Sequence, residues 1–359
     1  MRSLSKLPLT WLQECSTYVT GGNFTGFKGI EAEGWDDLGF PIAEISSSGE
    51  VIITKQKGTQ GLVSADTCTS QLLYEIQGPW YFNSDVTAIL DGLWFEQLST
   101  NRVALRGVKS APPPPTTKVG LTARGGYQAE FHFFPTGLDI DAKARMCEMQ
   151  IRKAVGDHAK KFTKFEFTKN GTAMENPTNQ NAATVDFRIF VQAPTEDDIS
   201  PAKILRPCLD SIMQSYPGST PHLDFRQGFP KQVFEYYVTL IPQADIEHKV
   251  HLEGGETIVI APPPQTRTYD KQQPSDPVTS NAVDLSSFGP TQKGPLGWVA
   301  HARSGDKGSN ANVGFWVKTD EEWQWLRTLL SAEKMKYLLA DEYKTGNKIV
   351  SPFNLPFSL

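Results

Sequence analysis

The sequence has few cysteines, no long apolar run and no surplus of positive charge, and each of these absences excludes a class of protein. Its four cysteines are widely separated and form no C-x-x-C pair, which argues against a structural zinc site and a disulfide framework. No apolar stretch approaches the roughly 20 residues that a membrane-spanning helix needs. The formal net charge of −5 provides no basic surface for a nucleic acid. We therefore expect a reduced, cytoplasmic protein with neither a membrane nor a nucleic acid as partner.

The length and the distribution of proline indicate several structural segments. With 359 residues, 39% of them hydrophobic and 21% charged, the chain has the size and composition of a globular protein with two or three domains. A stiff run of prolines at residues 112–115 is a natural boundary. The expected division is an N-terminal α/β portion over residues 1–110, a central α+β unit over 111–260, a proline-rich linker over 261–294 and a C-terminal domain over 295–359.

Hydrophobic periodicity predicts an α+β fold whose central unit has a mainly antiparallel or mixed sheet. Residues 41–45 and 51–55 are typical of a β-hairpin, and Gly125-Gly126 predicts a second hairpin between strands 118–123 and 127–134. The other predicted helices span residues 67–76, 141–155 and 205–213, and the other predicted strands span 102–108, 162–168, 185–192 and 233–241, the last of them buried. Helical spacing places Cys147 in the core, as a packing thiol rather than a nucleophile.

One face of the strand at residues 127–134 carries Gln128, Glu130 and His132. An amide, a carboxylate and an imidazole in a row can form a general acid–base set, in which Glu130 fixes the tautomer of His132. The alternative is a solvated sheet face, which the pattern alone favours.

The stretch from His301 to Asn310 is the strongest candidate site. We expect a strand over residues 296–302, a glycine-rich loop and a second strand over 313–318. Glycines at 305 and 308 allow positive φ, so that successive amide groups form a nest for an anion between Arg303 and Lys307. The expected anion-binding residues are Arg303, Ser304, Gly305, Gly308, Ser309 and Asn310. A tight turn with Asp306 paired to Arg303 or Lys307 is an equally good interpretation.

A capping box at residues 319–322 and apolar residues at helical spacing predict a helix after this stretch. A second helix over residues 332–340 and a strand near 348–350 complete a β-β-α-α-β order. Such an order forms a small α/β sandwich.

Seven short motifs along the chain carry a resemblance to a known family. In order, they are Tyr18-Val-Thr-Gly-Gly-Asn-Phe, Gly39-Phe-Pro-Ile-Ala-Glu-Ile, Gln71-Leu-Leu-Tyr-Glu-Ile, Tyr81-Phe-Asn-Ser-Asp-Val, Thr117-Lys-Val-Gly, Gly125-Gly-Tyr-Gln-Ala-Glu and His301-Ala-Arg-Ser-Gly-Asp-Lys-Gly. Together they resemble the acyclic terpene utilisation (AtuA-like) family, which has bacterial and fungal members. The resemblance implies a role near the breakdown of branched acyl-CoA or terpenoid acids and a ferredoxin-like domain at the C-terminus. It also implies that the N-terminal portion is truncated, because family members usually have an α/β segment upstream of the first motif.

The first functional hypothesis is an enzyme that acts on a small carboxylate, an acyl-CoA thioester or a terpenoid- or polyketide-derived metabolite. Its reaction is proton transfer with elimination or addition, by a lyase, hydratase or isomerase that needs no metal and no cofactor. Asp306 or His301 is then the proton shuttle, Lys307 helps to hold the anion, and Glu130 with His132 is the reserve pair.

Two alternatives remain open. The chain is a non-catalytic ligand-binding or assembly subunit of a catabolic or secondary-metabolite pathway, or the segment around Asp306 is only a structural turn. A small-molecule substrate is the expected partner, and a homo-oligomer is compatible with the sequence.

Overall fold

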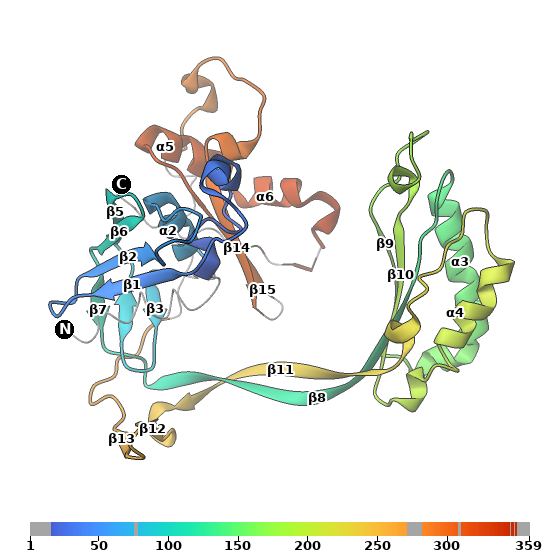
Figure 1. Cartoon of the computed structure of the whole chain (residues 1–359), viewed down its shortest axis with the longest axis horizontal. Coiled ribbons are helices and arrows are strands. Elements are labelled where there is room, and N and C mark those ends of the chain that lie inside the picture. Colours follow the sequence, from blue (N-terminus) through green and yellow to red (C-terminus); the bar gives the residue numbers. More distant parts are fainter. Residues whose placement is uncertain are drawn as a thin grey trace. The chain divides into compact units, whose positions relative to one another are not determined.

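The computed structural model describes residues 16–74, 78–270, 282–307, 310–344, 346–347 and 349, with only the backbone at residues 16, 307 and 310. The chain forms two compact units (Figure 1). Residues 1–118 and 240–359 form the first, here called unit 1, and residues 119–239 form the second, unit 2. All described strand pairs are antiparallel, and both units contain helices, which confirms the α+β class. The segments expected as N-terminal and C-terminal domains both belong to unit 1.

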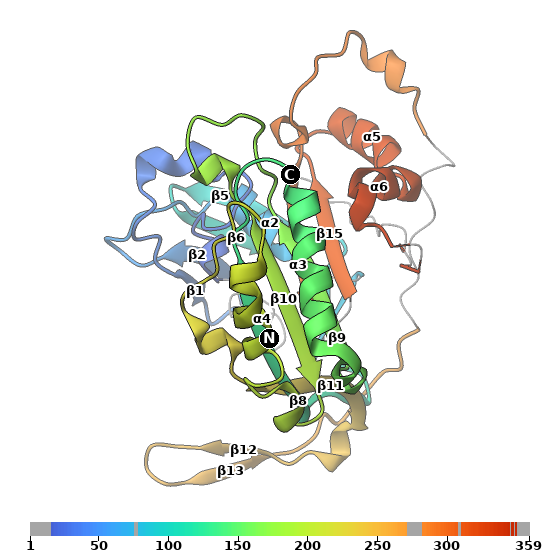
Figure 2. The same cartoon turned by 90° about the vertical axis from the view of Figure 1, so that its right-hand side faces the viewer.

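Unit 2 is built on a four-stranded antiparallel sheet in the order β11-β8-β10-β9. Its strands are β8 (Thr116–Phe133), β9 (Lys164–Asn170), β10 (Asp186–Ala193) and β11 (Lys231–Pro242), and its helices are α3 (Ile140–Val155) and α4 (Leu205–Ser211). Figure 2 shows both helices over one face of this sheet. The boundaries of α3 lie within one residue of the prediction, because its apolar and polar residues alternate at strict helical spacing.

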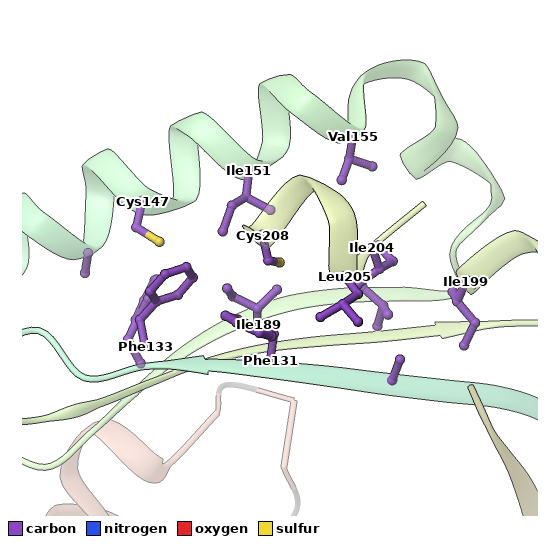
Figure 3. Close-up of a cluster of buried hydrophobic side chains, with 14 of the residues drawn as sticks. Phe131, Phe133, Cys147, Ile151, Val155, Ile189, Ile199, Ile204, Leu205 and Cys208 are labelled. Atoms are coloured by element: carbon purple, nitrogen blue, oxygen red, sulfur yellow. The ribbon is translucent and has the colours of Figure 1, made fainter. Parts of the chain in front are cut away.

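The core of unit 2 lies between its helices and its sheet (Figure 3). Cys147 and Ile151 project from α3 toward Phe133 of β8 and Ile189 of β10, and Cys208 of α4 joins them. Burial raises the pKa of the Cys147 thiol to about 12, so this cysteine stays a neutral, unreactive packing group. The prediction of a core thiol is therefore confirmed.

The prediction of a hairpin at Gly125-Gly126 is wrong, because strand β8 continues through both residues. Beyond them, residues 127–133 pair with β10, and the other edge of β8 pairs with β11. A Cβ atom on Gly126, whose φ is 102°, would lie 2.5 Å from the carbonyl oxygen of Ala193. Gly125 packs in the same way against the side chain of Glu235 on β11. The two glycines allow close approach of neighbouring strands, which is the other common meaning of glycine in a strand.

The strand predicted over residues 233–241 is confirmed as β11, but the prediction that it is buried is wrong. Nearly all of its side chains are exposed, although most of them are apolar. An unbroken apolar run predicts burial on two faces. Here, instead, β11 is the edge strand of its sheet and no described helix packs on its middle.

The described residues of unit 1 form four antiparallel sheets, in the orders β1-β2-β6-β5, β3-β4-β7, β12-β13 and β14-β15. The strands before the polyproline segment are β1 (Pro41–Ile45), β2 (Val51–Lys55), β3 (Trp80–Phe82), β4 (Thr87–Ile89), β5 (Trp94–Ser99), β6 (Arg102–Arg106) and β7 (Lys109–Ala111). Those after it are β12 (His248–His251), β13 (Thr257–Ile260), β14 (His301–Lys307) and β15 (Asn310–Trp316). The predicted β1–β2 hairpin is confirmed.

Helix α2 (Ala65–Leu72) anchors the core of unit 1. Its N-cap is Ser64, whose hydroxyl accepts a hydrogen bond from the backbone of Thr67 in a complete capping box. Cys68 and Leu72 of α2 pack against the central sheet through residues such as Ile53. This packing fixes the position of α2 in unit 1, where the helix also contacts β14 and β15.

The C-terminal part consists of the β14–β15 hairpin followed by α5 (Asp320–Leu329) and α6 (Ala332–Leu339). The predicted bounds of the strand at residues 296–302 are wrong, because residues 296–298 form a 3₁₀ turn and the strand begins only at His301. Leu326 of α5 and Leu330, which caps the C-terminus of this helix, form a small core with Ala300. The predicted last strand near residues 348–350 falls largely outside the described residues.

The capping box at the start of α5 provides a test of this local assignment. The Thr319 hydroxyl accepts from the backbone of Glu322, and the Glu322 side chain accepts from the backbone of Thr319. Thr319→Ala should lower the free energy of unfolding by about 1 kcal/mol, because the backbone amide of Glu322 in the first turn of the helix loses its side-chain acceptor. Urea denaturation measures the change. Glu322→Gln is the control, since glutamine keeps an oxygen at this position; an equal loss in both variants would contradict the capping assignment.

Candidate functional site

Arg303 of β14 is a buried cation and the centre of the candidate site. Its side chain is only 7% exposed, and its guanidinium carbon lies 4.3 Å from the ring centre of Tyr18 and 4.2 Å from that of Tyr74. Its Nε atom is buried without a hydrogen-bond partner among the described residues. Within the same part of the chain, no carboxylate forms an ion pair with Arg303. Two aromatic faces thus hold a positive charge that no described anion neutralises.

The space beside Arg303 is a cavity of about 360 Å³. It is lined by Asn23, Tyr74, Arg303, Ser304, Gly305, Asp306 and Ala311. Asn23 also lines a second, mostly apolar cavity of about 740 Å³, whose wall includes Phe24, Phe27, Trp35 and Leu38. Asn23 has a φ of 58°, a left-handed conformation that asparagine tolerates better than most residues. A polar and an apolar cavity therefore meet at Asn23.

His301 lies on the same face of β14 as Arg303 but lines neither of these cavities. Its ring is stacked between Phe24, at 5.3 Å between ring centres, and Trp316, at 4.6 Å. The Nδ1 atom is 3.0 Å from the hydroxyl of Thr25, and the Trp316 indole donates to Ser70 at 2.8 Å. Burial lowers the pKa of His301, although the charge of Asp66 opposes this effect. His301 is therefore a neutral packing residue at pH 7.

Three of the motifs that carry the family resemblance meet at Arg303. The first brings Tyr18 and Asn23, the motif at residues 71–76 brings Tyr74, and the C-terminal motif brings Arg303 itself. Gly314, opposite Arg303 in the hairpin, has no side chain, and a Cβ there would lie 2.6 Å from Leu73. The hairpin can therefore approach the end of α2 closely enough to bring these motifs together.

A family model described as "Acyclic terpene utilisation family protein AtuA" matches residues 9–252, and one described as "AtuA ferredoxin-like domain" matches residues 294–352. The chain belongs to the AtuA family. The comparisons with curated proteins and with solved structures returned no match. Membership confirms the resemblance and the ferredoxin-like C-terminal domain, and it points to a role in acyclic terpene utilisation. None of the helices in the described ranges is long and apolar enough to span a bilayer.

The predicted amide nest is not formed where this AtuA chain is described. Gly305 lies within β14 and pairs with Asn312 of β15, so its backbone belongs to a strand ladder rather than to a turn. Asp306 is exposed and leaves β14 on the opposite side from Arg303, so the predicted ion pair between these two residues is not formed. The predicted residues Gly308 and Ser309 lie outside the described residues, and Lys307 and Asn310 are described by their backbone alone.

Sequence reasoning did not single out Tyr18, Asn23 or Tyr74 as site residues, because no local pattern distinguishes them from packing residues. Tyr18 is almost fully buried, and burial raises the pKa of its hydroxyl, so it stays protonated. Two observations identify these residues: each lies in one of the family-like motifs, and the structure brings them together around the buried Arg303. Neither spacing nor charge pattern contains that information.

The reserve pair Glu130 and His132 belongs to unit 2 of the AtuA chain and is arranged differently from the prediction. The Nδ1 atom of His132 is 2.7 Å from Asp186, and Glu130 accepts from the Arg188 guanidinium at 2.6 Å. Asn170 donates to the other oxygen of Asp186 at 3.1 Å. Asp186, not Glu130, therefore orients the imidazole. Glu130 is bound instead to Arg188, the residue that faces His132 on the neighbouring strand. In the part of the chain that is described, no three His, Cys, Asp or Glu side chains gather as metal ligands.

The buried imidazole of His301 predicts a pH dependence of stability. Its folded pKa lies below the ordinary value of 6.5, so the unfolded chain binds the proton more tightly. The contribution of His301 to stability is complete above about pH 6.5 and is lost as the pH falls toward the folded pKa. Urea denaturation between about pH 5 and 7.5 should therefore show a steeper acid loss for wild type than for His301→Gln. His251→Gln, at an exposed site, is the control, and an unchanged pH slope in His301→Gln would contradict the assignment.

Proposed function

We propose that this AtuA-family chain is an enzyme that binds a branched aliphatic carboxylate, or the corresponding acyl thioester, at Arg303. The proposed reaction is proton transfer with elimination or addition. The observation that carries the proposal is the buried Arg303, which has no described carboxylate partner and faces a cavity.

A buried guanidinium without a counter-ion is energetically expensive. Removing a charge from water costs several kcal/mol, in order of magnitude, unless an anion compensates for it. Tyr18 and Tyr74 contribute cation–π attraction of about 0.5–2 kcal/mol each, which offsets only part of that cost. A ligand anion that enters the cavity completes the compensation. A carboxylate or an enolate oxygen suits the planar donors of arginine particularly well.

The adjoining cavity suits the hydrocarbon part of such a ligand. Phe24, Phe27, Trp35 and Leu38 form an apolar wall that begins at Asn23, where the polar cavity ends. Both volumes lie in the range of about 300–1,000 Å³ that is typical of small-molecule pockets. A carboxylate at Arg303 and a branched chain against Trp35 would occupy both spaces in one extended molecule.

Asp306 is the titratable carboxylate on the wall of the polar cavity. In the proposed step, the Asp306 carboxylate takes a proton from the carbon next to the carbonyl group. The electron pair of that C–H bond moves into the carbonyl, and Arg303 stabilises the enolate oxygen that forms. Collapse of the enolate expels a leaving group from the β-carbon, and hydration is the reverse. His301 lines neither cavity, so we propose that it positions neighbouring residues by packing and does not transfer a proton.

A non-catalytic ligand-binding subunit is the second candidate, and one observation favours it. Along β14, side chains alternate between faces, so that Asp306 and Arg303 leave the strand on opposite sides. Asp306 is therefore poorly placed to take a proton from a ligand whose carboxylate is bound at Arg303.

Two measurements test the proposal together. Isothermal titration calorimetry should show binding of 3,7-dimethyloctanoate and none of 3,7-dimethyloctanamide, because only the acid is charged. Proton NMR in D₂O should show exchange of the α-protons of 3-methylbutanoyl-CoA. In Asp306→Asn, the exchange rate should fall by about 100-fold or more with unchanged binding, in the range usual for loss of a general base.

The matched control is Asp91→Asn, at an exposed loop aspartate, which should leave both binding and exchange unchanged. Equal binding of the acid and the amide would refute the role of Arg303. Binding of the acid without any proton exchange in wild type would establish the non-catalytic alternative.

A further inference from the structure

The edge strand β11 of unit 2 carries an apolar stripe that no described element covers. On one face of the strand, Phe234 is 64% exposed, Tyr236 is 62% exposed and Val238 is 54% exposed. These residues are two apart and therefore leave the strand on the same side. Gly120 of β8 lies directly beneath the ring of Tyr236, so that side chains of β8 do not shield the stripe there.

The outer edge of β11 is also free to pair. In the sheet order β11-β8-β10-β9, β11 has β8 on one side and no described strand on the other (Figure 1). Between Gln232 and Leu240 its one charged residue is Glu235, whose carboxylate accepts a hydrogen bond from the hydroxyl of Tyr237. This stretch contains no lysine, proline or glycine, which are the residues that normally prevent the pairing of exposed edges.

The opposite edge of the same sheet shows the contrast. Strand β9 carries Lys164, Glu166 and Lys169 along its length, and its apolar residues Phe165 and Phe167 pack against the core of unit 2. Charged residues of this kind protect an edge strand from association. One edge of the sheet is therefore protected in the usual way, and the other has the composition of a strand that pairs.

We propose that β11 is the interface of a homodimer, in which two copies of the chain pair antiparallel through this edge. A two-fold axis at the middle of the strand gives each residue its partner in the other copy, and the backbone groups of the free edges satisfy one another. The sheets of the two copies then form one continuous sheet, on which the two stripes of Phe234, Tyr236 and Val238 lie next to each other.

The exposed area is compatible with a second copy as the occupant. Together with Tyr237 on the other face, the stripe exposes on the order of 400 Å² of side chain. This is about half of the ~800 Å² that each partner of a standard interface buries. Strand pairing over residues 233–239 and the flanking side chains supply the remainder. The enrichment in tyrosine and phenylalanine is also typical of the centre of an interface.

The test is the mass of the full chain in solution. Size-exclusion chromatography with light scattering at about 50 µM should give twice the chain mass for wild type, within the affinity range of standard interfaces. Phe234→Lys and Tyr236→Lys should give the mass of one chain, with unchanged far-UV circular dichroism. Met149→Lys, at an exposed apolar residue of α3, is the control and should remain dimeric.

Hydrogen–deuterium exchange of wild type provides a second measurement that needs no variant. Protection of the amides at residues 233–239 should increase with protein concentration, whereas that of β9 should not. A wild-type monomer at this concentration, or dimers that persist in both lysine variants, would overturn the proposal.

Discussion

Arg303→Met should abolish the binding of 3,7-dimethyloctanoate while leaving the protein as stable as wild type or more so. The loss of affinity should be at least about 100-fold, because removal of one partner of a buried ion pair costs roughly 3–5 kcal/mol. Stability should not fall, because methionine relieves the desolvation of a charge that has no described counter-ion in the free protein. Calorimetry measures the affinity, and urea denaturation measures the free energy of unfolding.

Two further variants separate charge from geometry at this position. Arg303→Lys keeps the positive charge but loses the planar donors, so its affinity should lie between those of wild type and Arg303→Met. Arg102→Met is the matched control in unit 1. Its ion pair with Glu44 is exposed and screened by solvent, and binding should be unchanged. A purely structural role for Arg303 would instead produce a loss of stability of several kcal/mol in Arg303→Met, in the range known for broken buried networks.

Phe133→Ala should destabilise unit 2 by about 3–5 kcal/mol, the usual cost of replacing a buried phenylalanine with alanine. The Phe133 side chain is fully buried, and its ring centre is 5.1 Å from that of Phe131. The cavity that remains lies between the sheet and α3, where Cys147 and Ile151 cannot collapse inward without moving the helix (Figure 3). Denaturant unfolding of the full chain should show the loss.

The control for this prediction is Met149→Ala on the outer face of α3. Met149 is largely exposed, and its removal should change the free energy of unfolding by less than about 0.5 kcal/mol. Comparable losses in Phe133→Ala and Met149→Ala would contradict the assignment of the core to the inner face of α3.

Elements whose pattern is local could be predicted from the sequence. The alternation of apolar and polar residues defines α3 almost to the residue, and the turn at Ser48-Gly49 defines the β1–β2 hairpin. The helix signals before α5 were equally reliable, because its capping box involves only residues 319–322. In each case the atoms that decide the structure lie within a few residues of one another.

Features that depend on distant partners could not be predicted. Gly125-Gly126 has the composition of a hairpin turn, and only its neighbours Ala193 and Glu235 show that it belongs inside a long strand. In the same way, the apolar run of β11 has the pattern of a buried strand, whereas its place at the edge of the sheet leaves it exposed.

The candidate site shows the same limit. The C-terminal motif suggested Arg303 as a site residue, and strand alternation places it on the same face as His301. Its role as a binding residue stays a prediction. The prediction of an amide nest is wrong at Gly305, because this residue of β14 pairs with β15 in an antiparallel ladder. The burial of Arg303 between Tyr18 and Tyr74 depends on residues more than 200 positions away in the sequence. No local pattern contains that arrangement.

The most direct test of the role of Arg303 is a crystal structure of the chain with bound 3,7-dimethyloctanoate. We expect the ligand carboxylate within hydrogen-bond distance of the Arg303 guanidinium, with the branched chain against Phe24 and Trp35. A carboxylate bound elsewhere, or a guanidinium that turns to a protein carboxylate and leaves the cavity, would contradict it.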